Sequence, residues 1–127
     1  MDSLIGFTLE RAKEDLNYAA KCIDENNLRF AVDRAYYTIY HAIRAVVLLG
    51  QKDFKQEAEL IAYFNENYIK ASLFPSDLYN LISGVQRVKN MNAYDDMYAV
   101  SVYEAEKQAE SAKLIYNLIE KYIISQE

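Results

Sequence analysis

An arginine, a tyrosine and a histidine recur at helical spacing in the segment "RAYYTIYHAIRA", residues 34–45. Arg34, Tyr37 and His41 are separated by three and four positions, which places all three on one face of a helix. On that helix Arg34 and His41 lie about 10 Å apart along the axis and within roughly 20° of the same face. An imidazole could accept the 2′-hydroxyl proton of RNA, while a guanidinium offsets charge that develops on the phosphate. The spacing is compatible with RNA cleavage.

The same three side chains also have a structural interpretation. An arginine inside an apolar helix needs a carboxylate or carbonyl partner, because an unpaired buried charge costs several kcal/mol. Asp95 and Asp96 in "AYDD" could fold over this helix and supply that partner, with His41 bonded to a tyrosine such as Tyr37 or to the backbone. Since a single histidine among apolar neighbours is usually a satisfied core residue, we prefer the structural interpretation and keep the catalytic one as its alternative.

A second group of candidate residues follows in "RVKNMNAYDD". Arg87 is a further candidate for catalysis, and together with Lys89 it could hold phosphates while Tyr94 stacks on a base. Two adjacent aspartates without other ligands do not predict a metal site, and no glycine-rich phosphate loop is visible. We therefore expect neither a metal nor a cofactor.

The elements that must position these residues are predicted to be helices. Only three glycines and one proline occur in 127 residues, of which 52% are hydrophobic. Narrow apolar stripes run over residues 5–23 and 105–123, whereas residues 28–49 are apolar on nearly all sides, which is typical of a helix surrounded by neighbours. We expect an all-α, antiparallel, up-and-down bundle of four to five helices, formed by residues 1–127 as a single domain.

Helix ends are predicted from local signals. Gly50 is placed to close the central helix, and a third helix is expected over residues 54–70. Ser76 could cap a fourth helix, and residues 90–98 break the apolar period and predict a loop. In "SVYE", Ser101 and Glu104 form a capping box that opens the last helix.

Charge and cysteine content exclude several classes of protein. A net charge of −5 argues against broad nonspecific attraction to nucleic acid, although Lys and Arg outnumber Asp and Glu between residues 29 and 89. The lone Cys22 offers no intramolecular disulfide and no thiolate cluster, which fits a reducing compartment. No apolar stretch is long enough to cross a membrane. We expect a cytoplasmic protein that does not bind membranes.

The segments "RAYYTIYHAIRAVVLLG", "LIAYFNENYIKASLFPSDL", "GVQRVKN" and "AYDD" together resemble the HEPN family, the higher eukaryotic and prokaryotic nucleotide-binding domains. The resemblance spans nearly the whole chain. More specifically, the chain resembles the stand-alone bacterial and archaeal branch, which carries an R-x-Y-Y-x-x-(F/Y)-H-A signature. It implies a helical bundle that is usually a homodimer. It also implies a toxin-like role beside a minimal nucleotidyltransferase antitoxin, and in many members a metal-independent ribonuclease.

The ribonuclease motif that the resemblance implies is an arginine, four to six intervening residues and a histidine. Arg87 occupies the arginine position, but Asn92, Ala93 and Tyr94 stand at the three spacings where histidine would be. The leading hypothesis is therefore a dimeric module that works with a nucleotidyltransferase-type partner and has a degenerate ribonuclease motif. An active endoribonuclease toxin and a nucleotide-binding regulatory domain are the alternatives, so the ligand would be RNA or a nucleotide.

Overall fold

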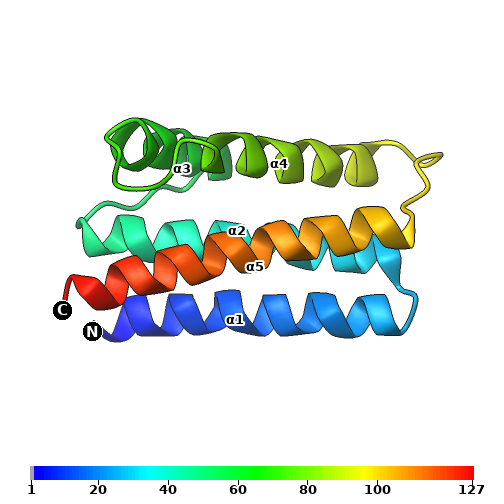
Figure 1. Ribbon diagram of the computed structural model, residues 1–127, viewed down its shortest axis with the longest axis horizontal. Helices are drawn as coiled ribbons and strands as arrows, with labels where there is room; N and C mark the ends of the chain where they lie inside the picture. The colour runs from blue at the N-terminus through cyan, green and yellow to red at the C-terminus, as the bar shows by residue number, and fades with distance from the viewer. Residues whose placement is uncertain (1) are drawn as a thin grey trace.

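The computed structural model describes residues 2–127. Its helices are α1 (Ser3–Asp24), α2 (Leu28–Leu49), α3 (Glu57–Phe64), the π-helical turn η1 (Asn65–Ile69), α4 (Leu78–Tyr94) and α5 (Val102–Ser125). Figure 1 shows α1, α2, α4 and α5 running along the long axis with alternating direction, while α3 lies at one end. No strand occurs within residues 2–127. The predicted all-α, up-and-down bundle is confirmed.

Helix α2 is the centre of the bundle, as its apolar sequence predicts. It packs against α1, α5, α4 and α3, and in Figure 1 it lies behind α5 and between the levels of α1 and α4. Ile39, Ile43 and Val46 on this helix are buried, and burying each such side chain contributes about 1.5–3 kcal/mol. Most of the core therefore forms around α2.

The ends of α1 and α5 are capped by side chains. Asp2 accepts from the amide of Leu4 at 2.8 Å, and the Ser101 hydroxyl accepts from the amide of Glu104 at 3.0 Å. The second half of the predicted capping box is absent, because the Glu104 carboxylate accepts instead from the Tyr98 hydroxyl at 3.0 Å.

Three predicted boundaries are wrong. The third helix begins at Glu57 rather than at residue 54. The end of the predicted helix forms the π-helical turn η1. The residue before α4 is Asp77 rather than Ser76, and no side chain caps this end. Helix α4 continues to Tyr94, so residues 90–94 are helical and not part of a loop. Contacts with α2, described below, hold this polar last turn in place.

Gly50 does end α2, but not through left-handed backbone. Its φ is −83°, and the left-handed residue is the following Gln51, with φ 65°. Packing disfavours a side chain at position 50 instead, because a Cβ there would lie 2.8 Å from the Tyr68 hydroxyl, which would have to move. The small residue lets the η1 segment approach the end of α2.

Within residues 2–127, none of the helices combines the length and the hydropathy that crossing a bilayer would require.

Candidate functional site

Asp15 of α1 is the residue at which Arg34 and His41 of α2 meet. Its Oδ1 accepts from the Arg34 guanidinium at 3.0 Å, and its Oδ2 lies 3.6 Å from Nε2 of His41. The Asp15 side chain is only 14% exposed and that of His41 13%, whereas Arg34 is 36% exposed. One carboxylate thus joins the two candidate residues of α2, and the sequence did not identify it.

The surroundings of His41 favour the neutral form of its imidazole. Burial lowers the pKa of its imidazole below the ordinary 6.5, and Arg11, Arg44 and Arg34 lower it further, while Asp15 acts in the opposite direction. Nδ1 of His41 is sealed from solvent and has no hydrogen-bond partner within residues 2–127. A neutral imidazole beside a carboxylate is the protonation state that a general base requires.

Two cations lie within 6 Å of the centre of the Tyr37 ring, and one of them, Lys89, comes from α4. The Arg34 guanidinium is 5.5 Å from the centre of the Tyr37 ring, and the Lys89 ammonium is 5.9 Å from it. Lys89 is also 4.9 Å from the ring of Tyr36. Each contact is within the range of cation–π attraction, so the structure brings Lys89 to the α2 residues.

Tyr36 and Tyr94 complete the surroundings of Lys89. The Tyr36 hydroxyl donates to Glu57 at 2.7 Å, and burial together with this carboxylate raises the pKa of Tyr36 well above its usual value. Tyr36, Lys89 and the 84% exposed Tyr94 line one pocket of about 230 Å³. This exposed ring and the neighbouring ammonium could contact a base and a phosphate.

A larger pocket opens beside the shared carboxylate. It has a volume of about 360 Å³ and is lined by Glu14, Asp15, Tyr18, Phe30 and Arg34. Tyr18 and Phe30 are both more than half exposed. The two aromatic rings and the Arg34–Asp15 pair that line this pocket could hold a small planar group, and His41 is not among the lining residues.

The predicted pairing of Arg34 with Asp95 and Asp96 is wrong. Both aspartates are exposed, and Oδ1 of Asp95 accepts from the amide of Met97 at 3.0 Å. Arg34 is held by Asp15 instead, because the side of α2 that carries Arg34 faces α1. The segment around residue 95 is held by another arginine, Arg29.

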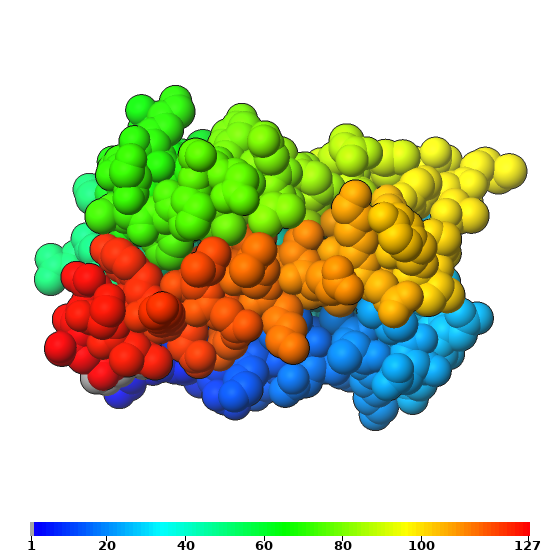
Figure 2. Space-filling model, viewed as in Figure 1, coloured from blue at the N-terminus to red at the C-terminus, as the bar shows by residue number. Residues whose placement is uncertain are grey.

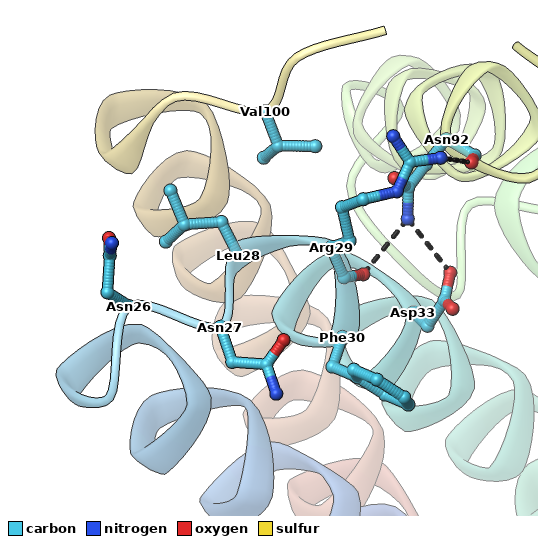
Figure 3. A pocket seen from close by; sticks show the side chains of 8 residues that line it. All are labelled: Asn26, Asn27, Leu28, Arg29, Phe30, Asp33, Asn92 and Val100. Atoms are coloured by element: carbon cyan, nitrogen blue, oxygen red, sulfur yellow. Dashed lines mark hydrogen bonds between the residues drawn. The ribbon is translucent and has the colours of Figure 1, made fainter. Parts of the chain in front are cut away.

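Arg29 ties α2 to the end of α4, as Figure 3 shows. Its guanidinium donates to the backbone carbonyls of Asn92 and of Tyr98, the latter at 2.7 Å. The buried Asn92 amide reaches back to α2, donating to the Arg29 carbonyl at 2.9 Å and to Oδ1 of Asp33 at 3.2 Å. Position 92 therefore serves as a brace between helices.

Around this brace lies a pocket of about 540 Å³, formed where α1 turns into α2. It is lined by Asn26, Asn27, Leu28, Arg29, Phe30, Asp33, Asn92 and Val100. Phe30 also borders the pocket beside Asp15. The two pockets therefore adjoin each other at Phe30.

Arg87 does not lie with the other candidate residues around Asp15 and Tyr37. Two positions on a helix differ by about 200°, so Arg87 and Lys89 face opposite sides of α4. Lys89 packs on the tyrosines of α2, whereas Arg87 borders a groove shared with Glu104 and Lys107 of α5.

Comparison with known proteins gives the family of this chain. The model of the HEPN domain matches residues 5–122. The chain belongs to the HEPN family. A relative in Methanocaldococcus jannaschii, named "Putative toxin MJ0142", is 23% identical over 117 residues, which is 92% of this chain and 80% of the relative. A second protein of that organism, "Putative toxin MJ0605", is 43% identical over 68 residues, about half of each chain.

One further relative and one solved structure cover nearly the full length. A UPF0332 protein of Thermotoga maritima is 21% identical over 96% of this chain and 92% of its own. The crystal structure of TT1696 from Thermus thermophilus superposes with a TM-score of 0.81 at 18% identity, covering 95% of this chain and 99% of that one. At this identity the TT1696 structure shows the fold alone. HEPN membership and the helical bundle thus agree.

Proposed function

We propose that this protein is the toxin-like half of a two-component pair, in which residues 1–127 form one HEPN domain that dimerises and works with a nucleotidyltransferase-type partner. The observation that carries this proposal is the use of Asn92. Five positions after Arg87, where the shortest spacing of the family's ribonuclease motif would place histidine, the chain has a buried amide that braces α4 against α2. An amide has no proton that titrates near neutral pH, so Asn92 cannot act as a general acid or base.

Two relatives that are named as toxins support the toxin-like part of the proposal. If the family's own catalytic histidine is missing and His41 does not replace it, an effect of this chain on the host comes from binding rather than from RNA cleavage. A pair in which this chain binds a host target and the partner relieves the effect meets this requirement.

The test is to express the protein in a host with and without the protein encoded beside it. We expect growth arrest with the HEPN protein alone and normal growth when the two are produced together. An Asn92→Ala variant shows whether the brace is needed for the effect. Equal growth in all strains, or arrest that the neighbour does not relieve, contradicts the pairing.

An active endoribonuclease is a second candidate function, which the shared carboxylate favours. Asp15 holds a neutral imidazole and a guanidinium within 3.6 Å and 3.0 Å of its two oxygens, beside a pocket of about 360 Å³. In this function Arg34, which lines the pocket, offsets the phosphate charge, and the imidazole of His41 has to turn toward the pocket before it can take the 2′-hydroxyl proton.

Incubation of the purified protein with RNA in the presence of EDTA separates the two candidates. Cleavage that is lost in both His41→Gln and Arg34→Gln, and retained in Arg87→Gln, supports the endoribonuclease. No cleavage by the wild-type protein, with growth arrest intact, supports the partner-dependent function.

A further inference from the structure

Two adjoining pockets meet at Phe30, where α1 turns into α2. Asp33 and Asn92 line the larger one, of about 540 Å³, and Glu14 and Tyr18 line the smaller one, of about 360 Å³. The Phe30 residue borders both pockets and is 56% exposed. Figure 2 shows the end of α1 and the start of α2, in blue to cyan, at the surface beside the first turns of α5. A ligand that lies across the Phe30 ring can therefore reach both pockets.

Each pocket contains one arginine that already has acceptors within the chain. Arg29 donates to the backbone carbonyls of Asn92 and Tyr98, and Arg34 donates to Asp15 at 3.0 Å. These bonds tie one guanidinium to the end of α4 and the other to α1. The two arginines are thus accounted for by contacts inside the chain.

The carboxylates of Glu14 and Asp33 are not paired in this way. Among residues 2–127, no nitrogen of a Lys, Arg or His side chain lies within 4.0 Å of either carboxylate. The two pockets together are lined by three acids and two arginines, so the net charge of the lining is negative. Each pocket therefore offers one carboxylate without a cationic partner in this part of the chain, and the electrostatics favour a cation.

The buried amide of Asn92 is an independent indication of a ligand. The residue is 4% exposed, and its Nδ2 donates to the Arg29 carbonyl and to Asp33, as Figure 3 shows. Its Oδ1 has no hydrogen-bond partner among the described residues. A buried acceptor without a donor is unfavourable. An ammonium group has three N–H donors and no acceptor, so it suits a pocket in which Asp33 and Asn92 offer oxygens.

We propose that these two pockets bind a linear diamine or polyamine. One ammonium group binds beside Asp33 and Asn92, and a second binds beside Glu14. The methylene chain between them lies across the exposed ring of Phe30, which attracts both methylene groups and cations. Each contact alone is weak, but linking the two ammonium groups makes the second contact intramolecular. This inference goes beyond the proposed function, which gives no role to Glu14 or Phe30.

Amide NMR spectra of the full chain, titrated with 1,4-diaminobutane at constant ionic strength, test the proposal. We expect saturable shifts concentrated in residues 14–18 at the end of α1 and residues 26–34 at the start of α2. The ligand n-butylamine has the same carbon chain but only one ammonium group. It should bind at least roughly tenfold more weakly, because it cannot engage both carboxylates at once.

Two substitutions and a matched control locate the site. Glu14→Gln should lower the affinity for 1,4-diaminobutane about tenfold, to the level of n-butylamine, because one carboxylate is removed. Phe30→Ala should also weaken binding, and the variant should fold because the ring is largely exposed. Glu110→Gln replaces an exposed glutamate of α5 that lines neither pocket, and it should keep the wild-type affinity.

Three results would overturn the proposal. The first is a set of shifts that rise linearly without saturation, or that saturate on helices other than α1 and α2, since either would mean general attraction to an acidic protein. The second is equal affinity for 1,4-diaminobutane and n-butylamine. The third is equal affinity of Glu14→Gln and Glu110→Gln for the diamine.

Discussion

Replacing Asp15 by asparagine should loosen the contact between α1 and α2 by a measurable amount. The substitution keeps the shape of the side chain but removes the charge that Arg34 contacts at 3.0 Å and His41 at 3.6 Å. Fully exposed ion pairs contribute about 0.2–1 kcal/mol, and breaking a buried pair costs about 3–5 kcal/mol. Asp15 is 14% exposed and Arg34 36%, so the pair lies between these limits.

We expect Asp15→Asn to lower the free energy of unfolding by about 1–2 kcal/mol. For a chain of this length, that corresponds to a fall in Tm of roughly 3–6 °C. Urea unfolding at pH 7.5, followed by circular dichroism, measures the change directly. The control is Glu14→Gln, because Glu14 is exposed and forms no ion pair with another of residues 2–127. It should stay within about 0.5 kcal/mol of wild type.

A double-mutant cycle with Arg34→Gln isolates the interaction itself. The two substitutions should show a coupling energy of at least about 0.5 kcal/mol, since residues in direct contact are rarely additive. An Asp15→Asn variant as stable as Glu14→Gln, or fully additive effects in the cycle, would refute the idea that this carboxylate holds the two helices together.

Three further predictions concern pH, packing and the α2–α4 brace. Burial lowers the pKa of His41 below 6.5, so between the folded and unfolded pKa values the unfolded state binds more protons, and stability falls as the pH drops from 7.5 to 5.5. Urea midpoints measured at pH 7.5 and pH 5.5 should show this fall in the wild-type protein and a smaller fall in His41→Gln. An equal fall in both proteins would contradict it. Gly50→Ala should lower the free energy of unfolding by about 1–3 kcal/mol through overpacking against the Tyr68 hydroxyl. Thermal melts should show a smaller loss of stability when Tyr68→Phe is also present. The same loss with and without Tyr68→Phe would exclude this contact as the cause. Asn92→Ala should lower the free energy of unfolding by about 1–3 kcal/mol and speed hydrogen exchange in the last turn of α4. Unchanged exchange there would mean that this turn stays helical without the Asn92 brace.

The apolar pattern is sufficient to predict the helices and the central position of α2. The stripes over residues 5–23 and 105–123 become α1 and α5, and the all-apolar segment becomes the buried helix. The end of α4 was not predictable in this way, because the Asn and Asp residues near position 92 are typical of turns in isolation. Its helical conformation depends on Arg29, which is 63 positions away in the sequence.

The candidate site was only half visible in the sequence. Arg34, Tyr37 and His41 follow from helical spacing, whereas Asp15 is one of several acids in α1, and only the rotation of α1 against α2 selects it. The separation of Arg87 from Lys89 could have been foreseen, because an interval of two residues turns a helix by about 200°. The residues that Arg87 and Lys89 contact could be known only from the packing of α4 between α2 and α5.

Joint purification with the protein encoded beside this chain tests the proposed pairing with a nucleotidyltransferase-type partner most directly. Size-exclusion chromatography with light scattering gives the mass of what elutes after co-expression. The proposal predicts one complex that contains two copies of the HEPN protein together with the partner. Separate elution of the two proteins at every concentration tested would contradict it.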